Sequence, residues 1–263
     1  MYVKKAIEKI GPKVRTVSSA AGSFKKPTDA GQLTGKVGLV TGGSNKVGLQ
    51  IGIKLAEKFK GSEKRSRIYL TTRYTKTIKD LEEALAKACN HDEEIMASIQ
   101  FVPLDLRDKG SLFKLYRKIK DEAMSLDILV NNARKFVLPT QSNEQLFKEQ
   151  CVEALQVNYE GMKRICKTFT PMLNHAGRIV LCSSHLGHLS NIDGNEPSAY
   201  KLRKKFADKN LNEDKLDRLI KEFQDHANGE FGQWVHNGWP SCPFTVSNIA
   251  VNAYSRCDKV KLL

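Results

Sequence analysis

The sequence predicts an α/β protein with a Rossmann-like, doubly wound parallel sheet. Short apolar segments alternate along the chain with longer segments of helical period, which is the order of repeated strand–helix–strand units with right-handed crossovers. The apolar segments are continuous runs, as expected for parallel strands that helices cover on both faces. Each run ends in polar residues or glycine. Ligands bind at the carboxyl ends of the strands in such sheets, so these ends form the candidate site.

Five strands are expected where short apolar runs are bounded by polar or turn-forming residues. They cover residues 36–41, 66–71, 98–105, 127–132 and 177–184. Helices are expected between them, over residues 46–60, 77–90, 109–124 and roughly 143–173. In the first helix the apolar residues recur at helical spacing on one face, namely Val47, Ile51, Leu55 and Phe59.

Length and composition indicate a globular protein. A chain of 263 residues, of which 40% are hydrophobic, can bury the core of one large α/β domain or two small ones. No apolar run approaches the roughly 20 residues that a membrane span requires, so a cytoplasmic location and no membrane partner are expected. Residues 1–35 are basic and serine-rich, and we expect them to be a tail that precedes a domain at 36–263. A mitochondrial transit peptide is the alternative for this tail.

The formal net charge is +14, and residues 1–35 contribute +5 of it because they hold seven basic and two acidic residues. A solvated basic surface is the preferred interpretation, and nucleic-acid binding through the tail stays open as an alternative. The six cysteines show no C-x-x-C spacing, and His185 and His188 have no nearby carboxylate. Neither a metal site nor a disulfide framework is therefore expected.

The first predicted strand runs into a helix through the glycine-rich stretch TGGSNKVG at 41–48. Backbone N–H groups at such a helix N-terminus can bind a pyrophosphate. The second strand is followed by Arg73 instead of an acidic residue, and a guanidinium suits a ribose 2′-phosphate, which favours NADPH as the cofactor. The candidate cofactor-binding residues at the strand ends are Gly42, Ser44, Asn45, Lys46, Val47, Gly48, Arg73, Asp105, Leu106, Asn131 and Ala133.

These motifs occur together in one order along the chain. The glycine-rich stretch is followed by LD at 104–105, NNA at 131–133, VNYEG with Asn158, and SSHLG at 183–187. In this order and spacing the sequence resembles the short-chain dehydrogenase/reductase family over roughly residues 36–258, and within it the NADPH-dependent carbonyl reductases. The resemblance implies a helical insertion at about 190–238. It also implies that the stretch GWPSCPFTVSNIAV at 238–251 corresponds to the family's catalytic helix.

The same resemblance assigns four catalytic positions. In the family a serine binds the carbonyl oxygen, a tyrosine donates the proton, a lysine lowers the pKa of that tyrosine, and an asparagine holds a water. By position these are Ser184, Phe244, Asn248 and Asn158, so the tyrosine and the lysine are both replaced. Phenylalanine has no hydroxyl and cannot donate a proton.

Three further features bear on this assignment. Tyr200 and Lys204 have the tyrosine–lysine spacing of the family, but with seven tyrosines and 31 lysines in the chain about one such pair arises by chance. The charged sequence around them predicts a solvent-facing helix, and we interpret the pair as a coincidence.

Two family glycines are replaced in this sequence. Lys46 stands where the family has a glycine that lets the helix approach the pyrophosphate. Arg134 replaces the glycine of NNAG and is expected to crowd the cofactor.

The chain stops at Leu263, before the sixth and seventh strands that the resemblance implies. We therefore expect a C-terminal truncation after the helix that follows strand five. Strand five would then be an exposed edge of the sheet, and such an edge invites a protein partner.

We predict an NADPH-dependent carbonyl reductase of aldehydes, ketones or quinones that is weak or inactive. A catalytically inactive protein that binds NADPH or a partner is the first alternative, and a basic nucleic-acid-binding protein is the second. A small-molecule carbonyl compound is the expected partner if the protein is active.

Overall fold

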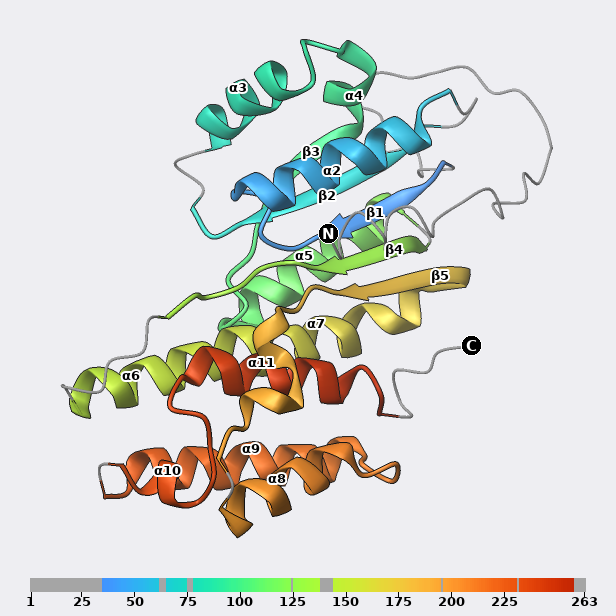
Figure 1. Ribbon diagram of the computed structural model, residues 1–263. Coiled ribbons are helices and arrows are strands. Elements are labelled where there is room, and N and C mark those ends of the chain that lie inside the picture. The colour runs from blue at the N-terminus through green and yellow to red at the C-terminus, as the bar shows by residue number, and fades with distance from the viewer. Residues whose placement is uncertain are drawn as a thin grey trace. The chain divides into compact units, whose positions relative to one another are not determined.

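The computed structural model describes residues 35–61, 65–74, 78–123, 125–137, 144–194, 196–230 and 232–257 (Figure 1). All but the last residue of the predicted basic tail lies outside these ranges. The described residues fall into two compact units. The sheet unit holds those up to Asn132 together with Ile165–Cys182, and the helical unit holds those of Ala133–Arg164 and those from Ser183 onward.

The sheet unit contains one five-stranded sheet, as predicted. Its strands have the order β3-β2-β1-β4-β5, and every neighbouring pair is parallel. The central strand is aligned with both neighbours, since Val40 pairs with Leu70 on one side and with Val130 on the other. The strands are β1 (Val37–Val40), β2 (Arg67–Thr72), β3 (Ile99–Pro103), β4 (Leu126–Asn131) and β5 (Leu173–Leu181).

Helices pack on both faces of this sheet, because successive strand residues point to opposite faces. Ile68 and Leu70 of β2 belong to a buried apolar cluster with residues of α2 (Lys46–Phe59), α3 (Ile78–Ala88) and α4 (Glu93–Ser98). Tyr69, which lies between them, reaches the other side, where its hydroxyl donates to Glu122 of α5 (Lys109–Glu122) at 2.6 Å. The arrangement is the doubly wound fold that the sequence predicts.

The observed boundaries differ from the expected ones by one or two residues at most element ends. The second strand begins and ends one residue later than expected, and the fifth begins at Leu173 instead of residue 177. Helix α4 was not expected; Asp92 caps its N-terminus by accepting from the Ile95 N–H at 3.1 Å. The long helix expected at 143–173 is divided into α6 (Glu144–Leu155), the π-helix η2 (Gln156–Gly161), α7 (Met162–Phe169) and the short 3₁₀ turn η3 (Thr170–Met172).

Strand β5 lies at an edge of the sheet, and none of its nine residues is buried. By contrast, all four residues of β1 are buried. This difference agrees with the expectation that strand five carries an exposed edge.

The helical unit contains α6, η2, the start of α7, and the elements that follow β5. These are η4 (His185–Gly187), η5 (Leu189–Asn191), α8 (Pro197–Ala207), α9 (Glu213–Asn228), α10 (Gln233–His236) and α11 (Pro243–Tyr254). Helices α8, α9 and α10 lie within residues 190–238, where the resemblance implies a helical insertion. Aromatic contacts tie these helices together: Phe147 of α6 stacks on Trp234 at 3.9 Å, and Trp239 packs against Phe206 and Phe223.

Helix α9 is joined to η2 and α7 by a polar cluster. Lys163 donates to both carboxylate oxygens of Asp217 at 2.5 and 2.6 Å and lies 3.6 Å from Glu213. The Tyr159 hydroxyl donates to Asp217 at 2.7 Å. Burial and this hydrogen bond raise the pKa of Tyr159, so the phenol stays protonated. The inserted helix is therefore held against the π-helix by charge-assisted bonds.

Within the described residues, no helix has the length and apolar character needed to cross a membrane.

Candidate functional site

In the sheet unit the predicted phosphate loop is a tight turn between β1 and α2. Its backbone bonds to the end of β2, with Gly42 N–H donating to the Thr71 hydroxyl at 3.1 Å and Gly43 N–H to the Thr71 carbonyl at 2.7 Å. Gly42 has a φ of 72°, the left-handed region that favours glycine. A Cβ at Gly48 would lie 2.2 Å from the Gly42 carbonyl oxygen, so only glycine lets the first turn of α2 close on this loop.

The N-terminus of α2 presents donors for an anion. Asn45 caps the helix by accepting from the Gly48 N–H at 2.7 Å. Among the described residues, the N–H groups of Ser44, Lys46 and Val47 have no hydrogen-bond acceptor. Lys46 is exposed at the first helical position. Unpaired N–H groups, the helix dipole and an ammonium group all favour negative charge here.

Asn132 braces the loop from β4 and was not among the predicted residues. Its side-chain amide donates to the carbonyls of Thr41 and Gly42 at 3.0 and 3.3 Å, and its N–H donates to the Thr41 hydroxyl at 3.0 Å. The neighbouring Asn131 is buried, and its Nδ2 donates to Cys166 Sγ at 3.3 Å. Among the described residues the Asn131 Oδ1 has no partner, which leaves a buried acceptor at the end of β4.

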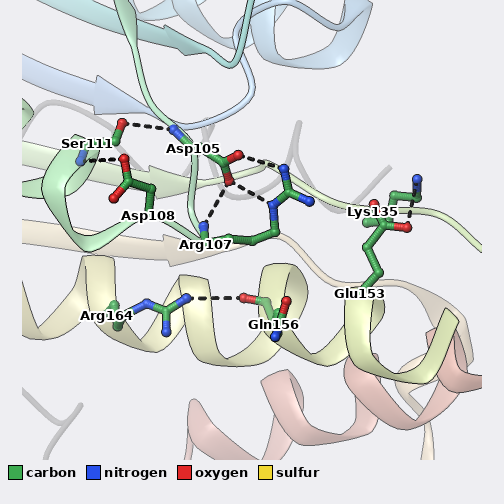
Figure 2. Close-up of polar contacts among 8 residues, drawn as sticks. All are labelled: Asp105, Arg107, Asp108, Ser111, Lys135, Glu153, Gln156 and Arg164. Atoms are coloured by element: carbon green, nitrogen blue, oxygen red, sulfur yellow. Dashed lines mark hydrogen bonds and ion pairs between the residues drawn. The ribbon is translucent and has the colours of Figure 1, made fainter. Parts of the chain in front are cut away.

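The predicted residues after β2 and β3 carry opposite charges. Arg73 is exposed and lies over the ring of Tyr74 at 5.3 Å. Figure 2 shows Asp105 held by Arg107, whose backbone N–H, Nε and Nη2 all donate to its carboxylate at 2.7 to 3.1 Å. The Arg107 guanidinium holds the pKa of Asp105 below its usual range. The Asp105 carboxylate is thus already engaged within its own loop, and Leu106 beside it is buried.

In the helical unit the π-helix η2 positions Asn158. A π-helix within an α-helix inserts a residue and frequently marks a functional site. Asn158 is 1% exposed; its Oδ1 accepts from the Lys135 N–H at 2.8 Å, and its Nδ2 donates to the Lys135 carbonyl and to the Ser247 hydroxyl at 3.0 Å each. Both amide protons of Asn158 are therefore bound to protein groups. Sequence reasoning missed Lys135 and Ser247, for which no motif gave a signal.

Phe244, at the position of the family's tyrosine, lies in an apolar environment. It packs in one buried cluster with Val137 and Ala154, and the partly buried Leu186 and Cys242 cover it. Its ring meets that of Phe136 edge to face at 5.0 Å. No group of this cluster other than the Cys242 thiol can donate a proton.

Asn248, at the position of the family's lysine, is fully buried on α11. Its Nδ2 donates to the Phe244 carbonyl one turn earlier at 2.7 Å, and its Oδ1 lies 3.4 Å from the Ser183 hydroxyl, which is long for a hydroxyl hydrogen bond. The residues from Phe244 to Val251 are all buried, as predicted for this helix. Asn248 thus presents no charge to a ligand, and one of its two amide protons is bound within its own helix.

Ser184, a predicted catalytic residue, keeps a hydroxyl that can donate a hydrogen bond. Its hydroxyl oxygen accepts from the Leu186 N–H at 3.2 Å and caps η4, and among the described residues its O–H has no acceptor. Close packing fixes this turn against α11, since a Cβ at Gly187 would lie 2.8 Å from the Asn248 carbonyl oxygen. Ser184 can therefore still donate a hydrogen bond to a ligand carbonyl.

The segment after β4 carries two cations. Lys135, fixed through its backbone by Asn158, extends its ammonium to Glu153 of α6 at 3.0 Å (Figure 2). Arg134, predicted to crowd a cofactor, is partly buried, as is Ala133. In α7, Arg164 donates to the carbonyl of Gln156, the first residue of η2, at 3.5 Å (Figure 2).

The structure agrees with the interpretation of Tyr200 and Lys204 as a coincidence. Both are exposed on α8, and the Lys204 ammonium lies over the Tyr200 ring at 4.6 Å. The described helices hold two more pairs with this spacing and the same geometry, Tyr116 with Lys120 and Tyr159 with Lys163. The spacing places side chains on one helix face and carries no catalytic information by itself.

Metal ligands do not cluster: among the described residues no group of three or more His, Cys, Asp or Glu side chains could hold an ion.

Known proteins resemble this chain across most of its length. A family model described as short chain dehydrogenase matches residues 36–204. Human carbonyl reductase (NADPH) 1 is 29% identical over 229 residues, which cover 86% of this chain and 74% of the relative. The (+)-neomenthol dehydrogenase of Arabidopsis thaliana is 28% identical over 243 residues, which cover 85% of this chain and 77% of that protein.

A solved structure agrees with this relationship. The menthone neomenthol reductase of Mentha piperita superposes with a TM-score of 0.69 at 25% identity, over 84% of each chain. The family model spans more than half of the sequence, and its match begins at the first strand of the observed parallel sheet. The chain belongs to the short-chain dehydrogenase/reductase family.

Proposed function

We propose that this protein binds NADPH and descends from carbonyl reductases, but reduces carbonyl compounds weakly or not at all. The replacement of the family's proton donor by Phe244, inside an apolar cluster, carries this proposal. The first relatives are named for NADPH, which is the cofactor proposed here.

The residues of the sheet unit fit a dinucleotide. The unpaired N–H groups at the start of α2 and the Lys46 ammonium suit a pyrophosphate. The exposed Arg73 guanidinium suits a 2′-phosphate, and the buried Asn131 Oδ1 offers an acceptor to a ribose hydroxyl. When bound, NADPH supplies the hydride for carbonyl reduction.

The chain's own contribution to reduction is incomplete. The Ser184 O–H can bind and orient a carbonyl oxygen. No group at Phe244 can deliver the proton that the alkoxide requires, and Asn248 cannot tune one electrostatically. Loss of a general acid typically costs on the order of 10²–10⁴ in rate. We therefore expect binding to persist where turnover does not.

Calorimetry with NADPH and NADH tests the binding half of the proposal. We expect NADPH to bind, and Arg73→Ala to weaken NADPH by about tenfold, roughly 1.4 kcal/mol, while leaving NADH unchanged. Lys58→Ala removes an exposed cation from the far end of α2 and serves as the matched control. Failure of the folded protein to bind NADPH would overturn the cofactor assignment.

An assay of NADPH oxidation with menadione and with reactive aldehydes tests the catalytic half. The expected turnover lies far below the enzyme median of about 10 s⁻¹. Turnover near that value would contradict the proposal. Tyr200→Phe is the control, because any residual activity should survive it.

A further inference from the structure

Two cysteines of the helical unit, Cys151 and Cys242, belong to segments that pack against each other. Helices α6 and α11 pack against each other. Ala154 of α6 and Phe244 of α11 belong to the same buried cluster, and Cys242, directly before α11, packs against it. Cys151 precedes Ala154 by three residues, which places both on one face of α6. Cys151 therefore lies about one helical turn before the α6 residue that shares a buried cluster with Cys242.

The bonding of these thiols differs from that of other cysteines. Cys89 and Cys257 donate to backbone carbonyls of their own helices at 3.7 and 3.6 Å, and Cys166 accepts from Asn131. Among the described residues, the thiols of Cys151 and Cys242 have no hydrogen-bond partner. No local bond has to be broken for either sulfur to react.

The two thiols also differ in access. Cys151 is 2% exposed, whereas Cys242 is partly exposed. Burial, and secondly the negative charge of an ionised Cys242, raise the pKa of Cys151 to about 12. A small oxidant in solution can reach Cys242 first.

We propose that Cys242 and Cys151 form a reversible, peroxide-sensitive disulfide that ties the start of α11 to α6. The Cys242 thiolate attacks one oxygen of hydrogen peroxide, the O–O bond breaks, and a sulfenic acid and hydroxide form. The Cys151 thiol then gives its proton to the hydroxyl of the sulfenic acid, its sulfur bonds to the Cys242 sulfur, and the S–O bond breaks so that water leaves. Two thiols and one peroxide yield one disulfide and two waters, so the two-electron oxidation is balanced.

The consequence lies at the first turn of α11. Cys242 stands two residues before Phe244, so the bond would fix the backbone beside the apolar cluster. The peroxide response does not require NADPH or catalysis, and therefore stands apart from the proposed function.

Mass spectrometry of the full-length protein tests the inference. After treatment with hydrogen peroxide and blocking of free thiols, a non-reducing digest should contain the Cys151 and Cys242 peptides joined by a disulfide, and dithiothreitol should release them. Cys89→Ser, a buried cysteine outside the pair, is the matched control and should form the same disulfide.

Two variants separate the steps. In Cys151→Ala, the Cys242 sulfenic acid should persist and be trapped by dimedone; in Cys242→Ser, neither the disulfide nor that adduct should form. Circular dichroism verifies that each variant is folded, and Cys151→Ser replaces Cys151→Ala if the latter is not. The proposal is wrong if peroxide leaves both thiols open to alkylation, oxidises Cys242 to sulfinic acid without a disulfide, or joins other cysteines.

Discussion

The sheet unit and the helical unit each carry candidate residues, and they depart from the family's pattern to different degrees. In the sheet unit the glycine-rich turn keeps Gly42, Gly43 and Gly48, although Lys46 stands where the family has a glycine. Backbone N–H groups at the start of α2 remain without acceptors among the described residues. In the helical unit the positions that the resemblance assigns to the proton donor and its lysine hold Phe244 and Asn248, and both amide protons of Asn158 and one of Asn248 are bound to protein groups.

The two units differ because cofactor binding and proton transfer depend on different kinds of groups. Anion binding at a helix N-terminus uses backbone groups, which most substitutions leave in place. Proton transfer needs one particular side chain at one position, and a single substitution removes it. A chain can therefore keep the dinucleotide turn while it loses the reaction.

The largest expected effect comes from restoring a tyrosine and a lysine at the two substituted positions of the helical unit. The double variant Phe244→Tyr with Asn248→Lys regains a proton donor and its cation. We expect NADPH-dependent reduction of menadione to rise by about 10²-fold or more. Position 248 is fully buried, so thermal unfolding is used to verify that the variant folds. The assay is run at saturating NADPH.

Phe244→Leu with Asn248→Lys is the matched control, since it lacks the hydroxyl and should show no gain. If the double variant is folded, binds NADPH and gains no activity, the helical unit has lost more than these two groups.

Removing the Asn158 amide tests how much its hydrogen bonds stabilise the helical unit. Asn158→Ala leaves a buried N–H and a carbonyl of Lys135 without their partner, and we expect the free energy of unfolding to fall by about 2–4 kcal/mol. Denaturant unfolding measures the change. Asn210→Ala, at an exposed position, is the control and should change it by less than about 0.5 kcal/mol. An equally small effect of Asn158→Ala would show that the π-helix needs no such bond.

The smallest expected effect concerns Asp105 in the sheet unit. Its pKa is depressed by Arg107, so the pair adds stability above the unfolded pKa and loses it as pH falls through the folded pKa. Arg107→Ala should raise the pKa of Asp105 toward its usual value of about 3.9, which a carboxyl NMR titration detects. The cost in stability should stay below about 1 kcal/mol because the pair is partly exposed. Lys109→Ala, which removes a neighbouring exposed cation, should leave this pKa in place.

Much of the sheet unit follows from local sequence. Continuous apolar runs such as VGLV predict buried parallel strands, and the alternation with helices predicts their order along the chain. The second strand was placed one residue too early, because apolar patterns define the interior of an element better than its ends. The π-helix was not predicted, since its residues continue the helical pattern on both sides.

The fold class and the glycine-rich turn could be read from the sequence alone, because each depends on residue types at short spacing. The assignment of Phe244 to the position of the proton donor stays a prediction. Only the tertiary structure decided where polar groups are directed. It directs Asn158 toward Lys135 and Asn248 toward its own helix, engages Asp105 with Arg107, and packs Cys242 beside the cluster that holds Ala154 and Phe244. Lys135 is 23 residues from Asn158 in the chain, whereas the partners of Asn248 and Asp105 are local, and buried polar groups take whichever partners packing provides.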